Sequence, residues 1–224
     1  MSFFDSFPQP PPPEPAPEPP RPAWMKPEFV VPGSVAADLV LVRTDEVAVT
    51  LGLLRAYTTG FEFTVDTRSR RRGQHHRIGA GPRRYLMQMQ GTDTEDRLRV
   101  GLEFSDGRRA ELGAPRPHPD QVTADTLVVH PCGGGGSDRS SHERYWVYPL
   151  PTPGPLSFIA TWPAFGITEA RIELEAEAVL SAAARAIVLW PEAPGRPLGE
   201  ATMGVVTAGR VERGDDETGA RPRT

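Results

Sequence analysis

The chain has 224 residues, a net charge of −4 and a single cysteine, Cys132. The negative charge argues against general nucleic-acid binding, and one cysteine cannot form an internal disulfide, so no oxidising compartment is needed. The first ten residues lack the basic and apolar regions of a secretory signal, and no stretch is long and apolar enough to span a bilayer. Lys26 is the only lysine, whereas Arg, Ala, Gly and Pro are abundant, a bias typical of a high-GC bacterial genome. We therefore expect a protein of a bacterial cytoplasm that has neither a nucleic acid nor a membrane as its partner.

Both ends of the chain have the composition of disordered segments. Residues 1–28 contain the acidic, proline-rich run PQPPPPEPAPEPPRP, which favours extended polyproline II because proline removes backbone donors and the run has nothing to bury. Such a run is either a ligand for a proline-recognising protein or a stiff spacer. Residues 192–224 are rich in Gly, Pro, Asp and Arg. We expect a single β-rich domain at 29–191 between these two tails.

Alternating apolar and polar residues predict the first strands of this domain. Val47–Leu53 and Phe61–Val65 show this period on either side of a short Thr-Thr-Gly turn, so we expect them to form a hairpin. Arg97–Phe104 alternates most regularly, with four apolar residues on one face and Arg, Arg, Gly and Glu on the other. The Asp106-Gly107 pair then predicts a second hairpin, with a return strand at Arg108–Leu112.

Shorter strands are predicted in the second half of the domain. We expect them at Thr126–Val129, Tyr145–Tyr148, Leu156–Trp162 and Arg171–Leu174. Pro131–Ser141, PCGGGGSDRSS, is predicted to be a flexible loop, since its glycines have no side chains to pack.

The hydrophobic period changes near the end of the domain. Leu180, Ala183, Ala184 and Ile187 recur at i, i+3, i+4 and i+7, which predicts an amphipathic helix over about 175–187. We expect this stripe, extended by Trp190, to cover an apolar face of the sheet, with Trp162 or Phe158 beneath it. Trp162 and Trp190 are therefore assigned to the core. The predicted fold is a mainly antiparallel β-sandwich of about eight short strands with one C-terminal amphipathic helix.

A basic stretch without periodicity, RSRRRGQHHRIGAGPRR at Arg68–Arg84, is predicted to be a long loop. It could bind an acidic protein surface or a phosphate-bearing ligand. It lacks interleaved aromatic residues that would stack nucleic-acid bases. Its candidate binding residues are Arg70, Arg71, Arg72, His75 and His76.

Trp146 and the glycine run Gly133–Gly136 define the alternative site, a small-ligand pocket. The glycines are not followed by the Lys and Ser/Thr of a phosphate-binding loop. The spacing of His130, Cys132 and His142 matches no standard zinc site, and nothing in the sequence places Cys132 in an electropositive niche that would activate it. We therefore predict no catalytic residue, no metal and no cofactor.

Several short motifs resemble a family of actinobacterial proteins without an assigned function. These motifs are Gly133–Gly136 before Trp146–Pro151, the turn Trp162–Ile167, and Ala182–Arg185 ahead of Leu189–Pro191. The resemblance covers most of 29–191, neither tail, and implies one domain of a conserved type without bringing an activity.

The sequence favours a non-enzymatic function over an enzymatic one. We expect a binding or scaffold module that meets a protein partner through its proline-rich tail or its basic loop. The alternative is a small-ligand-binding or enzymatic domain with a pocket near Trp146 and Gly133–Gly136. The sequence leaves the partner, the ligand and the oligomeric state undefined.

Overall fold

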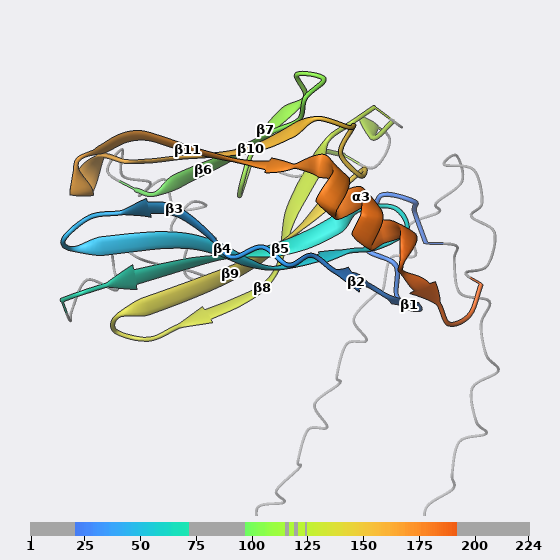
Figure 1. Cartoon of the computed structure of the whole chain (residues 1–224), viewed down its shortest axis with the longest axis horizontal. Helices are drawn as coiled ribbons and strands as arrows, with labels where there is room; N and C mark the ends of the chain where they lie inside the picture. The colour runs from blue at the N-terminus through green and yellow to red at the C-terminus, as the bar shows by residue number, and fades with distance from the viewer. Residues whose placement is uncertain (1–20, 72–96, 115–116, 119–120, 124, 192–224) are drawn as a thin grey trace, which may run out of the picture.

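The computed structural model describes residues 21–71, 97–114, 117–118, 121–123 and 125–191. Strands dominate this part of the chain, and every pair of neighbouring strands is antiparallel. The predicted class, mainly antiparallel β with one helix near the C-terminal end, is confirmed (Figure 1). The proline-rich run up to residue 20, most of the basic stretch and the tail at 192–224 lie outside the described residues.

The larger sheet has six strands. Its order is β2 (Gly33–Ser34), β4 (Val47–Ala56), β5 (Phe61–Ser69), β9 (Ser140–Tyr148) and β8 (Val128–Gly136), with β3 (Leu39–Arg43) also paired to β4. The alternation predicted for β4 is confirmed as far as Leu51, because Val47, Val49 and Leu51 are buried while the residues between them are partly exposed. It is wrong for Leu53, which is 64% exposed, because the strand register shifts after Gly52. The predicted hairpin between this strand and the next is confirmed by the β4–β5 pairing.

The smaller sheet has four strands in the order β11 (Ile167–Glu175), β10 (Pro155–Trp162), β6 (Arg99–Glu103) and β7 (Arg109–Glu111). The predicted Asp-Gly hairpin joins β6 to β7. Gly107 has a φ of 86° and donates its N–H to the Phe104 carbonyl, while the Asp106 carboxylate accepts the Arg108 N–H. Gly107 supplies the positive φ of this turn, which glycine adopts without strain, and the Asp106 side chain stabilises the turn by its hydrogen bond.

The two sheets stack face to face as a sandwich around one core (Figure 1). The Phe63 ring of β5 meets the Phe158 ring of β10 edge to face at 5.1 Å, and Phe61 lies 6.5 Å from Phe104. Trp162 is fully buried and packs edge to face on Phe165, in the short 3-10 helix η3 (Pro163–Phe165). The prediction that Trp162 belongs to the core is confirmed.

The helix α3 (Ala176–Ala184) is shorter than predicted, and its buried stripe differs. β11 continues into the helix without a loop, and the first helical residue, Ala176, is buried. Val179 and Ala182 follow at intervals of three residues, so they lie on the same face of the helix and are buried as well. Leu180 is only half-buried. The predicted stripe of Leu180, Ala183, Ala184 and Ile187 is therefore wrong.

The residues after the helix form a strand instead of continuing its apolar stripe. Ile187–Val188 make β12, which pairs with β1 (Val30–Val31) in a separate two-stranded ribbon. This pairing turns Trp190 outward, where 62% of its surface is exposed, so its assignment to the core was wrong.

The glycine-rich segment is also part of the sheet. Pro131–Gly136 belong to β8, and Gly133 to Gly136 pair with Arg144 to Ser141 on β9. The prediction of a flexible loop from 131 to 141 was wrong for these residues, because β9 begins at Ser140 and pairs with Pro131 and with Gly133 to Gly136. The turn is confined to residues 137–139.

Ordered packing begins earlier than the expected boundary at Phe29. Trp24 is buried against Val122 and Val128, and the Trp146 indole N–H donates to the Trp24 carbonyl at 2.9 Å. Residues 24–31 therefore form a strap across the outer face of the six-stranded sheet. At the C-terminal end of this strap, β1 pairs with β12 and so ties the strap to the segment that follows α3.

Candidate functional site

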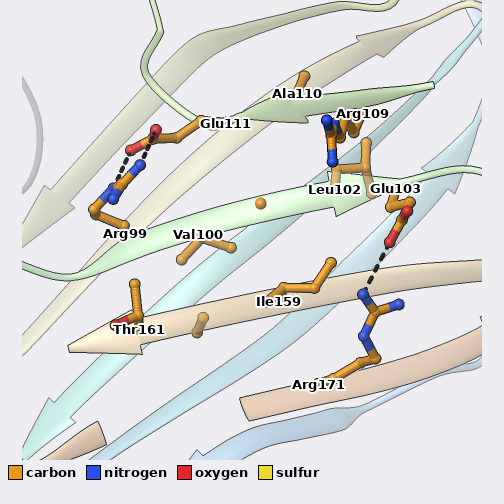
Figure 2. Close-up of a pocket in the computed structure, with 12 residues that line it drawn as sticks. Arg99, Val100, Leu102, Glu103, Arg109, Ala110, Glu111, Ile159, Thr161 and Arg171 are labelled. Carbon is orange, nitrogen blue, oxygen red and sulfur yellow. Dashed lines mark hydrogen bonds and ion pairs between the residues drawn. The ribbon is translucent and has the colours of Figure 1, made fainter. Parts of the chain in front are cut away.

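An open groove crosses the outer face of the four-stranded sheet. Its volume is about 360 Å³, and residues of β6, β7, β10 and β11 line it (Figure 2). Val100, Leu102 and Ala160 point into the core, so the alternate residues of the same strands face outward. The groove is thus a direct product of the alternation in these strands.

Gly101 lies at the floor of the groove and has no side chain to fill it. The strand register places Arg171, Ile159, Gly101 and Glu111 side by side across the four strands. A Cβ at Gly101 would lie 3.8 Å from the nearest atom, the Ala110 carbonyl oxygen, which is ordinary van der Waals contact. Neither the packing nor a positive φ requires glycine here, and the missing side chain leaves space open between the neighbouring strands.

Charged side chains form both walls of the groove (Figure 2). The Arg99 guanidinium donates two hydrogen bonds to Glu111, at 2.9 and 2.7 Å, in a bidentate pair. Arg171 Nη2 donates to Glu103 at 2.9 Å, and its Nη1 donates to the Ser157 hydroxyl at 3.0 Å. Exposed ion pairs add little stability, so the main effect of these pairs is to hold the walls in place.

Arg109 gives the lining an excess of positive charge. It lies opposite Glu103 in the β6–β7 register, but the hydrogen bond at Glu103 is made by Arg171. Arg109 forms no ion pair with any residue that the structure describes. The lining has three arginines and two glutamates, so it favours an anionic group.

A second polar cluster lies under the strap, on the outer face of the six-stranded sheet. Glu62 is 1% exposed and accepts hydrogen bonds from Lys26 Nζ at 2.5 Å and from the Tyr57 hydroxyl at 3.0 Å. Arg55 Nη1 lies 3.8 Å from the same carboxylate. A buried carboxylate needs such partners, because removing a charge from water is costly unless it is paired.

The pKa values in this cluster follow from burial and from the Glu62 charge. Burial alone would lower the pKa of Lys26, but its interactions with Glu62 and Tyr57 raise that pKa above its usual 10.5. Burial raises the pKa of Tyr57, and the Glu62 charge adds to this effect. Burial and Glu62 likewise raise the pKa of the Cys132 thiol. Because the thiolate is the nucleophilic form, Cys132 is a poor candidate for a nucleophile at neutral pH.

The predicted binding residues do not converge on one site. Arg70 and Arg71 are exposed after the end of β5, and Arg71 pairs with Glu46 at 3.4 Å. Arg72, His75 and His76 lie outside the described residues. A role for this basic stretch in binding stays a prediction.

Trp146 lies at the other end of the β5–β9 ladder, opposite Glu62. It is 0% exposed and packs edge to face on Tyr57 at 5.5 Å. Its ring therefore contributes to packing under the strap instead of lining an open pocket. Gly133–Gly136 are separated from it along β8 and lie in the paired strand described above.

Within the described ranges, no group of three or more His, Cys, Asp or Glu side chains is arranged to hold a metal ion. His130, Cys132 and His142, which the sequence brings close, are all on the β8–β9 ladder. His130 pairs with Trp146 and His142 with Gly135, so the ladder separates the two histidines.

Sequence reasoning identified the polar face of Arg97–Phe104 but assigned it no function. The sequence feature that could have indicated the groove is Gly101, which lies among charged residues on the solvent-facing side of the strand, where a glycine weakens the strand. The partner surface from β10 and β11 could not be inferred, because the pairing of β6 with β10 brings together residues far apart in the sequence.

No family model, curated protein or solved structure matches this chain. The resemblance to actinobacterial proteins thus stays a prediction. None of the helices in the described part of the chain is both long and apolar enough to cross a membrane.

Proposed function

We propose that the protein is a non-enzymatic binding module of a bacterial cytoplasm that holds an acidic segment of a protein partner in the groove across β6, β7, β10 and β11. The observation that carries this proposal is the gap at Gly101, bordered by Ile159 and by a cation-rich set of charges. An apolar side chain of the partner fits over Gly101 and Ile159, and a neighbouring carboxylate reaches Arg109.

The chemistry of the lining supports binding more than catalysis. The groove is lined by no histidine, cysteine, serine or lysine. Its two carboxylates, Glu103 and Glu111, accept hydrogen bonds from Arg171 and Arg99, so both are engaged instead of available as general bases. The alternative of a pocket around Trp146 has less support because that ring is fully buried.

A groove-filling variant tests the proposal. Gly101→Val projects a side chain into the groove without a backbone clash, and valine suits a strand better than glycine, so the fold should be kept. We expect the affinity for an array of Asp- and Glu-rich peptides, each with one Ile, Leu or Val, to fall by about tenfold or more, as measured by fluorescence anisotropy. Arg109→Gln should weaken the same peptides and flatten the dependence of their affinity on salt.

Gly52→Val is the matched control. It makes the same change in the interior of β4, where the nearest atom to an added Cβ is Asp38 Oδ1 at 3.8 Å, away from the groove. This variant should bind the peptides as the unchanged protein does. The proposal fails if no peptide of the array binds, or if Gly101→Val binds as well as Gly52→Val.

A further inference from the structure

Exposed apolar side chains are concentrated on one small element. Of the eight large apolar residues that are exposed in the described part of the chain, six lie in or beside the β1–β12 ribbon; the other two are Val40 and Leu53. The six are Phe29, Val31, Ile187, Val188, Leu189 and Trp190. The ribbon lies at the α3 end of the molecule, near β2 (Figure 1). Clustering of this kind marks an interaction surface, whereas singly scattered apolar residues do not.

The backbone of β12 also has an open edge. In the part of the chain that the structure describes, β12 pairs with β1 alone. The Leu189 N–H donates to the Phe29 carbonyl at 2.8 Å, so Leu189 faces β1 with its hydrogen-bonding groups. Hydrogen-bonded and non-hydrogen-bonded residues alternate along an antiparallel pair, and Val188 is the neighbour of Leu189. The N–H and C=O of Val188 therefore point away from β1.

Charge, which commonly prevents strand association at a sheet edge, is absent from this edge. Residues 186–190, AIVLW, carry no charge, so these residues give no electrostatic repulsion between two copies of the strand. The nearest charged side chain, Arg185, is turned back onto its own chain, where it donates to the carbonyls of Ser181 and Ser34 at 3.0 and 2.9 Å.

We propose that β12 pairs antiparallel with β12 of a second copy of the chain, about a two-fold axis at Val188. A residue with both groups free on an antiparallel edge is complementary to itself, because two such residues exchange N–H and C=O across the axis. This register places Trp190 of one copy opposite Ala186 of the other, where a small side chain leaves room for the indole. The two ribbons become one four-stranded sheet, β1–β12–β12–β1, in which the apolar side chains of the two β12 strands lie beside one another.

Dimerisation of this kind is independent of the groove. The residues of the ribbon and those that line the groove do not overlap, so a variant of one surface leaves the other intact. Failure of the peptide test would not affect this inference, and failure of this inference would not affect the peptide test.

Sedimentation equilibrium of the full chain over a concentration series tests the inference. We expect a reversible dimer, and Val188→Lys should raise its dissociation constant by about tenfold or more, because two ammonium groups meet at the axis. Val188→Pro should have the same effect by removing the N–H that each copy donates, while the β1 pairing keeps its hydrogen bonds. Val40→Lys is the control, since Val40 is 56% exposed on β3, outside the ribbon, and Val188 is 51% exposed.

A disulfide test keeps the inference decidable if a Val188 variant folds poorly. In a Cys132→Ser background, Val188→Cys should form a disulfide-linked dimer under mild oxidation, because Cα atoms of a hydrogen-bonded antiparallel pair lie about 5.5 Å apart, within disulfide reach. Val40→Cys in the same background should stay monomeric on a non-reducing gel. A chain that sediments as a monomer throughout, a dimer indifferent to Val188→Lys and Val188→Pro, or equal cross-linking at positions 188 and 40 would each overturn the inference.

Discussion

Gly33 lies directly beneath the last turn of α3, and the helix approaches it more closely than any side chain would allow. A Cβ on Gly33 would lie 1.9 Å from the Ala182 carbonyl oxygen and 2.7 Å from its carbon, both of which are backbone atoms. Ala182 is itself fully buried at this contact. One residue without a side chain thus sets the distance between the helix and β2.

Replacement of this glycine should be costly, because a helix backbone cannot move aside as a flexible side chain can. We expect Gly33→Ala to lower the free energy of unfolding by about 1–3 kcal/mol, the range for overpacked sites, in urea denaturation. Gly52→Ala, where a methyl group meets only ordinary contacts, should change it by less than about 0.5 kcal/mol. Equal shifts for the two variants would show that the helix does not rest on Gly33.

The buried face of the helix α3 could not be predicted from the sequence pattern. Alanine occupies positions 176, 178, 182, 183 and 184, so several faces of the helix are small and apolar and the stripe has no unique phase. The phase is decided by the direct passage of β11 into Ala176 and by the close contact at Gly33, which are tertiary features. For the same reason Ile187 and Val188, which fit the helical period, become a strand when β1 is there to pair with them.

The strands were predictable where one face is buried and the other is wet. In β6 and in β4 up to Leu51 the side-chain period is two, and each residue type agrees with its side of the sheet. Beyond Gly52 the register of β4 shifts and Leu53 is exposed, which the alternation did not predict. The groove was less accessible from sequence. Its polar residues on β6 could be recognised, but its floor needs Ile159 beside Gly101, a neighbour that only the pairing of β6 with β10 supplies.

The corrected stripe of α3 makes a direct prediction about stability. Val179 is 0% exposed, so Val179→Ala should lower the free energy of unfolding by about 1.5–3 kcal/mol. Leu180 is larger but only half-buried, and Leu180→Ala should cost clearly less, although it removes more atoms. Ser181→Ala, on the exposed side, should change little. The midpoints of urea denaturation of the three variants test this prediction. A greater loss of stability for Leu180→Ala than for Val179→Ala would contradict the burial of Val179 in place of Leu180.

At the scale of the whole molecule, the strap joins parts of the chain that the sandwich alone would leave separate. Trp24 and Lys26 attach it to the outer face of the six-stranded sheet, through Trp146 and Glu62. Val30–Val31 attach it to β12, beyond α3. The only lysine of the chain therefore neutralises a buried carboxylate at the point where the strap crosses the sheet.

This arrangement makes the stability of the whole fold sensitive to alkaline pH. The pKa values of Lys26, Tyr57 and Cys132 are all raised on folding, from ordinary values of 10.5, 10.0 and 9.0. Above these ordinary values the unfolded chain loses protons that the folded chain retains, so the free energy of unfolding falls as pH rises. The contribution is fully present below about pH 9 and is lost progressively as the pH rises through 10 and above.

Urea denaturation between neutral pH and about pH 10.5 measures this loss. The double variant Lys26→Met with Glu62→Gln removes the charge pair without leaving a lone buried charge, so its free energy of unfolding should decline less steeply above pH 9–10, the residual slope coming from the burial of Tyr57 and Cys132. The single variant Lys26→Met leaves Glu62 buried without its lysine and should be the least stable of the set at neutral pH. If the unchanged protein and the double variant lose stability in parallel through this range, the strap is not held by Lys26 and Glu62, and its attachment must depend on Trp24 and β1 alone.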